Sequence, residues 1–313
     1  MFYNEVIILS IKKILLFSLL VIFIPYIIIT LFIRNDEITF NFSSNTMVRV
    51  YRNETGIIER IPIEEYIVGV VAGEMPVTFS EEALKAQSVA SRSYLMYRMQ
   101  NTKNKDYDVV DTVSNQVYLD ELTLKENWKD KYTENINKIK RAVLDTSGEY
   151  LAYDNKVIDA MFFSTSTGYT ENSEEVFVSE LPYLRSVSST WDTISPAYED
   201  NKQFTYKEFY DLLDLEYAEN LNVEIIETTS TGRVKKLKIN NKEFNAKDIT
   251  SKLSLRSTYF EIQNSSDYIT IYTKGFGHGV GMSQYGAEGM AQSGYNYKDI
   301  LTHYYSGVEI KKF

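Results

Sequence analysis

The chain has 313 residues, 44% of them hydrophobic, and a net charge of −10 at pH 7. This length and composition allow a large buried core, either in one domain or in two closely packed lobes. The acidic balance argues against nucleic acid as the ligand, because nucleic-acid affinity depends on Lys and Arg that neutralise phosphates. The sequence contains no cysteine, which excludes a disulfide framework and a thiolate metal site.

The N-terminal region contains one long apolar run. Residues 14–33 are almost entirely apolar, and about 20 such residues can cross a bilayer as a helix. Lys12-Lys13 precede the run, which predicts a cytoplasmic N-terminus (1–13) and an extracytoplasmic remainder. A cleaved signal peptide is the alternative, but the residues after the run lack the small-residue cleavage pattern. We therefore expect a single-pass cell-membrane protein with a transmembrane anchor at 14–33 and a juxtamembrane spacer at 34–46.

Residues 47–313 are expected to form one extracytoplasmic domain of the α+β class, with strands predominating in its second half. Some segments have apolar residues at helical spacing, and others alternate apolar and polar residues as strands do. Gly, Asn and Asp separate these segments. The expected helices are Ile61–Ala72, Thr78 to about Met99, Glu134–Asp145, Lys207–Asp214 and Gln284–Ser293. The expected strands are Met47–Tyr51, Ile57–Ile61, Glu149–Tyr153, Val157–Phe163, Val223–Glu227, Val234–Ile239, Tyr259–Gln263 and Tyr268–Thr273.

Local signals place the ends of these helices. Gly73 and Gly294 are expected as C-terminal stops, and Thr78 with Glu81 as a capping box. Glu74 lies just past the first stop, where the negative end of the helix dipole and an apolar neighbour disfavour an ionised carboxylate. We therefore expect a raised pKa for Glu74, which suits a general acid. An exposed loop glutamate is the alternative.

The segment Gly275–Ala287 holds five glycines and one of the two histidines of the chain. Clustered glycines let the backbone adopt left-handed conformations or approach a ligand closely. The segment joins a strand end to a helix start, where backbone N–H groups favour polar or anionic ligands. The alternative is a tight turn in which His278 caps a backbone carbonyl, and composition alone leaves both interpretations open.

Three blocks closely resemble the stage II sporulation protein D (SpoIID) family, which also includes the LytB-type amidase enhancers. The resemblance covers roughly residues 47–313 and implies a two-lobed domain with a glycan-binding cleft and a catalytic acid at Glu74. The blocks are Gly73-Glu74-Met75-Pro76 followed by Glu82–Tyr94, Phe163–Thr170, and Gly275–Ala287.

The resemblance implies a lytic transglycosylase that cleaves the bond between N-acetylmuramic acid (MurNAc) and N-acetylglucosamine (GlcNAc), leaving a 1,6-anhydro end. Similar enzymes act on peptidoglycan strands stripped of stem peptides, beside a membrane-bound amidase and endopeptidase partner during forespore engulfment. The C6 hydroxyl of the sugar attacks, so no second carboxylate is required. A hydrolase requires one, and Asp111 and Glu171 are then the candidates. The alternative function is a non-enzymatic peptidoglycan-binding module that recruits or enhances an amidase.

The same blocks supply the candidate substrate-binding residues. Lys85 and Arg92 lie two turns apart near one helix face, where they either orient Glu74 or bind a muramyl carboxylate. The alternative is that both are solvated surface cations. Serines and tyrosines supply hydrogen bonds and stacking faces for sugars. The full set is Lys85, Gln87, Arg92, Tyr94, Ser164, Ser166, Gly168, Tyr169, Gly277, His278, Gly279, Gly281, Ser283, Gln284 and Tyr285.

The sequence departs from the family at its metal-binding positions. Many relatives carry a Cys and His cluster, but Val110 and Asn115 stand where sulfur ligands would be expected. His278 and His303 are the only histidines, and two distant histidines do not make a structural zinc site. We expect neither a metal nor another cofactor.

Overall fold

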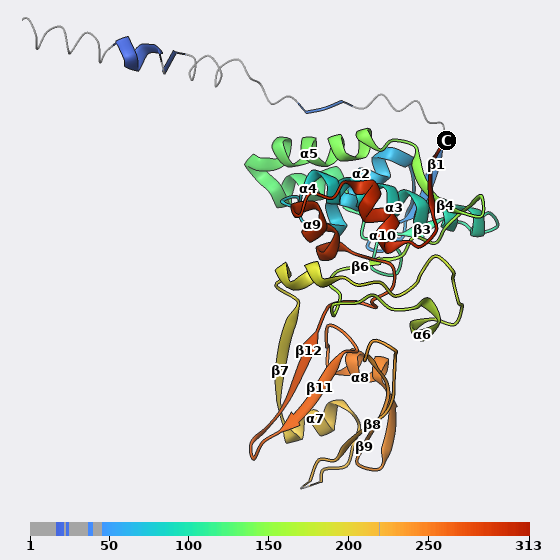
Figure 1. The fold of residues 1–313 in the computed structure, drawn as a ribbon, viewed down its shortest axis with the longest axis vertical. Coiled ribbons are helices and arrows are strands. Elements are labelled where there is room, and N and C mark those ends of the chain that lie inside the picture. The colour runs from blue at the N-terminus through green and yellow to red at the C-terminus, as the bar shows by residue number, and fades with distance from the viewer. Residues whose placement is uncertain (1–16, 22, 25–36, 40–45, 219) are drawn as a thin grey trace, which may run out of the picture.

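The computed structural model describes residues 17–21, 23–24, 37–39, 46–218 and 220–313. Helices and strands are mixed along the chain, so the expected α+β class is confirmed. The buried hydrophobic side chains form two separate clusters. The first joins residues 48–184 to the segment from residue 280 onward, and the second comes from residues 209–271. Figure 1 shows the helix-rich part and the strand-rich part at opposite ends of the long axis.

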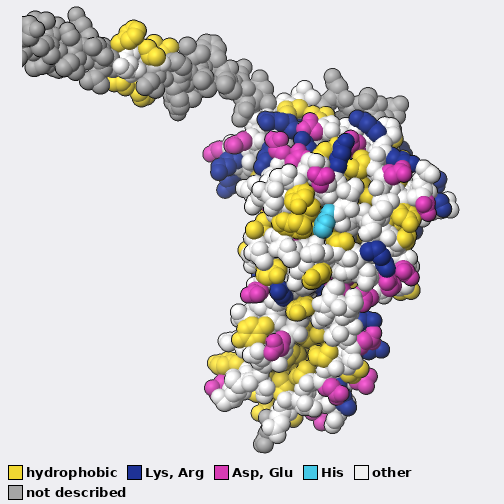
Figure 2. Space-filling model, in the orientation of Figure 1, with side chains coloured by type: hydrophobic (Ala, Val, Ile, Leu, Met, Phe, Trp, Pro, Cys, Tyr) yellow, Lys and Arg dark blue, Asp and Glu magenta, His cyan; other side chains and the backbone are white. Residues whose placement is uncertain are grey.

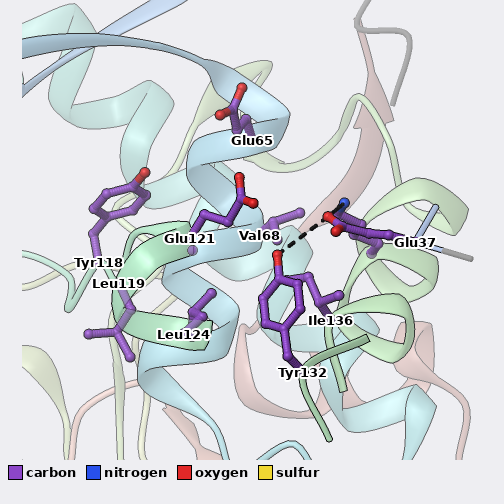
Figure 3. A pocket seen from close by; sticks show the side chains of 11 residues that line it. Glu37, Glu65, Val68, Tyr118, Leu119, Glu121, Leu124, Tyr132 and Ile136 are labelled. Carbon is purple, nitrogen blue, oxygen red and sulfur yellow. Dashed lines mark hydrogen bonds and ion pairs between the residues drawn. The ribbon is translucent and has the colours of Figure 1, made fainter. Parts of the chain in front are cut away.

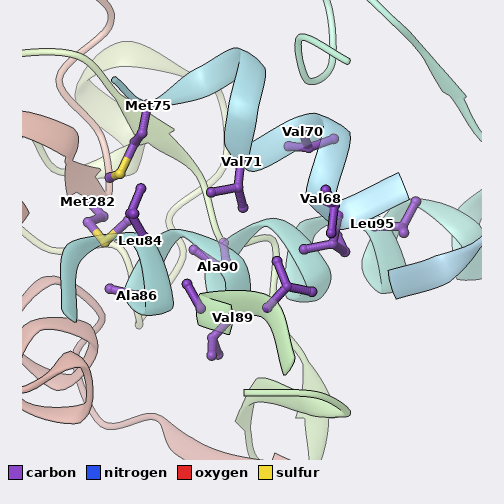
Figure 4. Close-up of a cluster of buried hydrophobic side chains, with 14 of the residues drawn as sticks. Val68, Val70, Val71, Met75, Leu84, Ala86, Val89, Ala90, Leu95 and Met282 are labelled. Atoms are coloured by element: carbon purple, nitrogen blue, oxygen red, sulfur yellow. The ribbon is translucent and has the colours of Figure 1, made fainter. Parts of the chain in front are cut away.

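The first cluster is mainly helical. Its central helix, α3 (Glu81–Asn101), packs against α2 (Ile63–Glu74), α5 (Tyr132–Asp145), α9 (Gln284–Gln292) and α10 (Tyr297–Tyr304). In Figure 4, valines of α2 lie over the alanine and leucine side chains of α3, with a methionine from the C-terminal segment beside them. Burial of each valine, leucine or methionine side chain contributes about 1.5–3 kcal/mol, so this packing holds α2 on α3, which also packs against α9.

Three small sheets border these helices, with strand orders β2-β1-β3, β14-β4-β5 and β13-β6. β6 and β13 pair in parallel and join the serine-rich block to the end of the glycine segment. The strands are β1 (Met47–Tyr51), β2 (Ile58–Pro62), β3 (Val109–Val110), β4 (Glu149–Tyr153), β5 (Lys156–Val157), β6 (Phe162–Phe163), β13 (Met282–Ser283) and β14 (Glu309–Lys312). The shorter helices of this part are α4 (Glu121–Trp128), η1 (Lys129–Lys131), α6 (Ser173–Val176) and η2 (Thr190–Ile194).

The second cluster is formed by side chains from two three-stranded antiparallel sheets, with orders β10-β9-β8 and β11-β12-β7, and from two short helices that pack on them. The elements are β7 (Glu199–Thr205), α7 (Tyr206–Leu212), β8 (Val223–Thr228), β9 (Val234–Ile239), β10 (Lys242–Asn245), α8 (Ala246–Lys252), β11 (Phe260–Asn264) and β12 (Tyr268–Lys274). The glycine segment follows β12 and returns the chain to the first cluster.

Most expected elements are present within a few residues, but three details were wrong. Gly73 lies inside α2, which ends at Glu74. The capping box at Thr78 is absent, since α3 begins after Ser80, whose N–H and hydroxyl donate to the Glu288 carboxylate of α9 at 2.6 and 3.1 Å. The expected strand Val157–Phe163 is interrupted, because its two ends join different sheets.

The expected transmembrane span lies largely outside the described residues. Residues 17–21 and 23–24 of it are helical, with exposed apolar side chains. Within the described residues, no helix has both the length and the apolar character needed to cross a bilayer. Part of the expected spacer is described, and Glu37 forms an ion pair with Lys140 of α5 at 2.6 Å.

Candidate active site

Glu74 is the last residue of α2, whereas the sequence analysis placed it just past the end of this helix. Its carboxylate accepts a hydrogen bond from the Val117 N–H at 2.6 Å and another from the Gln284 amide at 3.4 Å. Burial raises the pKa of Glu74, while the two hydrogen bonds lower it. The expected direction of the pKa shift is therefore confirmed, although desolvation is its largest cause.

Two glycines of α2 allow the chain to approach Glu74. A Cβ at Gly73 would lie 2.7 Å from the Val117 carbonyl oxygen, and one at Gly69 would lie 2.6 Å from that of Leu119. The Leu119 N–H donates to the Gly69 carbonyl at 3.2 Å. Gly73 is therefore required for close packing rather than for ending the helix, and that packing presents the Val117 N–H to the carboxylate.

The start of α9 brings Gln284 to Glu74 across 210 positions of sequence. Ser283 caps α9, because its hydroxyl accepts from the Gly286 N–H at 3.2 Å. The Tyr285 N–H donates to the Ser164 carbonyl at 3.0 Å, and the Tyr285 ring meets that of Phe79 edge-on at 5.0 Å. These contacts hold the first turn of α9, so the Gln284 side chain is oriented toward the carboxyl group.

Asp192 in η2 connects the serine-rich block to α9, a role that the sequence analysis missed. Its buried carboxylate accepts from the Ser166 N–H at 2.7 Å, from the Ser189 hydroxyl at 2.5 Å and from the Ser283 hydroxyl. Burial raises the pKa of Asp192, and these donors oppose the rise. No local pattern in the sequence distinguishes Asp192 from other acids, because its partners come from three separate segments.

The glycine segment packs against the protein's own backbone. Gly279 and Gly281 have φ of +86° and +83°, a conformation that L side chains rarely adopt. A Cβ at Gly281 would lie 2.0 Å from the Met161 carbonyl oxygen, and one at Gly279 would lie 2.8 Å from Glu171. The Gly277 N–H donates to the Arg256 carbonyl at 3.0 Å. These contacts favour the tight-turn interpretation, with the segment acting on the site by positioning α9.

His278 also has internal partners. Its Nδ1 accepts from the Val280 N–H at 3.1 Å, and its ring lies between those of Phe163 and Phe177, with centroids 5.6 and 5.5 Å away. The pKa of His278 is lowered to about 4, chiefly by burial and also by the positive charge of Arg233, while a hydrogen bond to the backbone opposes this shift. The ring is therefore neutral near pH 7 and stabilises the turn.

The structure corrects two nominated residues of α3. Arg92 is fully buried, and its guanidinium donates to both carboxylate oxygens of Glu64 at 2.9 and 2.6 Å. It is therefore neither a surface cation nor a ligand for a muramyl carboxylate. Gln87 is also fully buried and donates to the Ser91 hydroxyl at 2.9 Å.

The other two nominated residues of α3 lie in different surroundings. Lys85 forms ion pairs with Glu82 at 3.2 Å and Asp145 at 3.0 Å. The Tyr94 hydroxyl accepts from the Asn115 amide at 3.0 Å. Burial is the main cause that raises the pKa of Tyr94, and the charge of Glu74 adds to it. Tyr94 is therefore within electrostatic reach of the candidate acid.

Substitution of Arg92 should affect stability rather than the affinity for glycan. We expect Arg92→Met to lower the free energy of unfolding by about 3–5 kcal/mol, because it leaves the Glu64 carboxylate buried without its partner. Urea denaturation measures this loss. The double variant Glu64→Gln/Arg92→Met should recover part of it, since no buried charge remains. A folded Arg92→Met protein with unchanged stability and weaker glycan binding would restore the ligand role.

Three of the four nominated residues in the serine-rich block have structural partners. The Ser164 carbonyl accepts from the first turn of α9. Ser166 is buried, and its hydroxyl donates to the Ser189 carbonyl at 3.1 Å and accepts from the Gly168 N–H at 3.1 Å. Tyr169 differs, since 54% of its surface is exposed. Its ring is the one in this group that is open to stack on a sugar.

Both candidates for a second carboxylate are paired with arginines. Asp111 accepts from Arg52 at 2.9 Å. Glu171 is fully buried and forms an ion pair with Arg233 at 3.2 Å.

Among the described residues, no group of three or more His, Cys, Asp and Glu side chains is arranged to hold a metal. Asn115, at a position where sulfur would be expected, accepts a hydrogen bond from the Val110 N–H at 2.9 Å.

A cavity of about 150 Å³ lies between α2, α4 and α5. Glu37, Glu65 and Glu121 are among the residues that line it, and Figure 3 shows the hydrogen bond from Tyr132 to Glu37. Glu74 does not line it. The candidate acid therefore lies at the contact of α2 with α9, outside this cavity.

Comparisons with known proteins identify relatives of this chain. A family model described as "Stage II sporulation protein" matches residues 51–153. The chain is 46% identical over 274 residues to stage II sporulation protein D of Bacillus amyloliquefaciens, covering 86% of this chain and 80% of that protein. The protein of the same name from Bacillus subtilis (strain 168) is 44% identical over 275 residues, with the same two shares. The amidase enhancer of Bacillus subtilis (strain 168) is 29% identical over 300 residues, which is 78% of this chain and 40% of that protein. The chain belongs to the stage II sporulation protein D family.

Proposed function

We propose that this protein is a lytic transglycosylase that cleaves MurNAc–GlcNAc strands of peptidoglycan, with Glu74 as the catalytic acid. The observation that carries the proposal is the environment of this carboxyl group. Its raised pKa keeps a larger fraction protonated, and a general acid must donate a proton to the leaving oxygen. The Val117 N–H and the Gln284 amide then stabilise the carboxylate that remains after proton transfer.

In the proposed reaction, Glu74 protonates the oxygen that links MurNAc to GlcNAc, and the bond from this oxygen to C1 of MurNAc breaks. The C6 hydroxyl of the same MurNAc forms the new bond to C1, and the Glu74 carboxylate takes up its proton. The products are a 1,6-anhydro-MurNAc end and a GlcNAc with a free hydroxyl. This route needs one carboxyl group, which suits a site where Asp111 and Glu171 are held by arginines.

The proposed setting is the outer face of the cell membrane during sporulation. A helix across residues 14–33 would anchor the chain, and the exposed apolar side chains at residues 17–21 and 23–24 fit a lipid environment. In Figure 2, acidic and basic side chains are interspersed over the visible face of the domain.

The substrate would be strands stripped of stem peptides, bound in a cleft between the two parts of the domain. The partner would be a membrane-bound amidase or endopeptidase of the engulfment machinery.

A binding module that enhances an amidase is the second candidate, favoured by the 29% identity to an amidase enhancer. Both candidates are tested by incubating the purified full-length protein in detergent with denuded glycan strands and analysing the products by mass spectrometry. Transglycosylation predicts anhydro-MurNAc ends in the absence of an amidase. Strand binding without any anhydro product, together with faster hydrolysis by an added amidase, would support the binding module instead.

Metal removal provides a separate prediction. Because the chain has no cysteine and two histidines, we expect cleavage to survive exhaustive chelation and elemental analysis to find no stoichiometric zinc. The measurement is the rate of anhydro-product formation before and after chelation. Loss of activity that zinc alone restores would reveal a carboxylate-rich metal site and contradict the prediction.

A further inference from the structure

Residues 37 and 38 of the expected spacer are fastened to α5. The Ile38 N–H donates to Asn137 Oδ1 at 2.7 Å, and Lys140 Nζ donates to the Ile38 carbonyl at 2.8 Å. Lys140 also forms an ion pair with Glu37 at 2.6 Å, and the Tyr132 hydroxyl donates to the same carboxylate at 3.3 Å. These contacts hold the spacer on one helix, so the chain enters the domain at a fixed point on α5.

The chain before this point is too short to let α5 stand far from a bilayer. The expected anchor ends at residue 33, and four residue steps of about 3.3–3.6 Å reach at most about 14 Å. The polar headgroup layer takes up roughly 5–7 Å of that distance. With the anchor inserted, residue 37 and the part of α5 that holds it would lie within about 9 Å of the headgroup surface. Figure 1 shows α5 at one end of the long axis and the strand-rich part at the other.

The surface of η1 and α5 carries unpaired cations. Residues 129–141 contain five Lys and Arg against two Asp and Glu, a net charge of +3, in a chain whose net charge is −10. Lys129, Lys131 and Arg141 are exposed, and within the described part of the chain their side chains form no ion pair or hydrogen bond. Arg141 is four residues from Asn137 and therefore lies on the same face of α5 as the fastened spacer. The side of the domain nearest the expected anchor is thus locally basic.

We infer that Lys129, Lys131 and Arg141, together called the basic face, lie against anionic phospholipid headgroups at the outer surface of the membrane. Headgroup phosphates would accept charge-assisted hydrogen bonds from the three side chains. Each cation next to anionic lipid favours the contact about fivefold. The strand-rich part then points away from the bilayer. The inference rests on the membrane anchor of the proposed function, and it adds which side of the domain faces the lipid.

The test uses the absence of cysteine from the chain, since one introduced cysteine gives a single labelling site. A fluorophore is attached at Glu134→Cys, exposed on α5, or at Asp267→Cys, exposed in the turn between β11 and β12. The full chain is reconstituted in vesicles of phosphatidylcholine and phosphatidylglycerol, with a spin label on the headgroups that quenches fluorophores in contact with it. We expect strong quenching at position 134 and none at position 267.

A charge variant tests the basic face itself. Lys131→Gln/Arg141→Gln should weaken quenching at position 134, because the equilibrium for the contact falls about fivefold for each cation removed. Vesicles of phosphatidylcholine alone should weaken it in the same way. The matched control is Lys236→Gln/Lys242→Gln, which removes two exposed lysines of the strand-rich part and should leave the quenching unchanged.

The inference is overturned by equal quenching at positions 134 and 267, by stronger quenching at 267, or by quenching at 134 that depends on neither lipid charge nor the basic face. Flotation of the vesicles at high salt tests the anchor, and a protein that does not float with them refutes anchor and inference together. Cleavage of denuded strands is measured separately on the parent chain. Absence of anhydro product with strong quenching at 134 would refute the transglycosylase and leave the membrane-facing surface standing.

Discussion

Glu74→Gln is expected to reduce the formation of anhydro-MurNAc ends by about 10²–10⁴-fold, the usual contribution of general acid catalysis. Gln has nearly the same shape and can still accept the Val117 N–H bond, but it cannot deliver a proton to the glycosidic oxygen. The rate of product formation from denuded strands measures the effect. Binding of the strands should change little, because the substitution keeps the contact with Gln284.

The same substitution makes a prediction about stability. The folded state raises the pKa of Glu74 above its ordinary value of 4.5. The folded state thus favours the protonated form of this carboxyl group. The stability that it contributes is fully present below pH 4.5 and is lost as the pH rises through the raised pKa. Because Gln stays neutral, Glu74→Gln should be at least as stable as the parent at pH 8. Denaturation at pH 4 and pH 8 measures this difference.

The matched control is Glu65→Gln, an exposed glutamate on the same helix that lines the cavity of Figure 3. It should cleave strands at the parental rate. A folded Glu74→Gln protein with undiminished turnover would remove Glu74 from the catalytic role. Equal losses in both variants would indicate a general effect of altering α2 rather than the loss of an acid.

The sequence predicted the elements whose signals are local. Helical spacing placed α2, α3 and α5, and alternation placed β1, β8, β9 and β12 to within a few residues. Short elements such as β6 and β13 could not be predicted, because each has two residues and exists through pairing with a distant segment. The raised pKa of Glu74 was predictable in direction, but its burial depends on Val117 and Gln284, which come from other elements.

The roles of the surrounding residues were harder to predict for a physical reason. A sequence pattern cannot show which side of α3 is covered, so Arg92 was expected at the surface or in the site and is instead buried with Glu64. Conversely, Arg98 gave no signal in the sequence and has an unpaired buried nitrogen. In a sequence, a glycine that makes room for a ligand cannot be distinguished from one that makes room for the protein's own backbone. At Gly281 the nearby Met161 carbonyl shows that the backbone occupies this space.

The structural role of the glycine segment predicts a large loss of stability in Gly281→Ala. The position has φ of +83°, and the new Cβ would lie 2.0 Å from the Met161 carbonyl oxygen. Backbone strain and overpacking each cost about 1–3 kcal/mol, and the close approach to rigid backbone places the expected loss near the upper end of their sum. Urea denaturation measures the loss.

Gly294→Ala provides the matched control for this loss. Gly294 has φ of +90°, but a Cβ there would have no neighbour within 4 Å. It therefore carries the strain of a left-handed conformation without the steric clash, and the difference between the two variants isolates the contact with Met161. Since the segment positions α9, any Gly281→Ala protein that remains folded should also cleave more slowly, because Gln284 is displaced from Glu74. If Gly281→Ala is no less stable than Gly294→Ala but binds glycan more weakly, the segment contacts the ligand directly and the tight-turn interpretation is wrong.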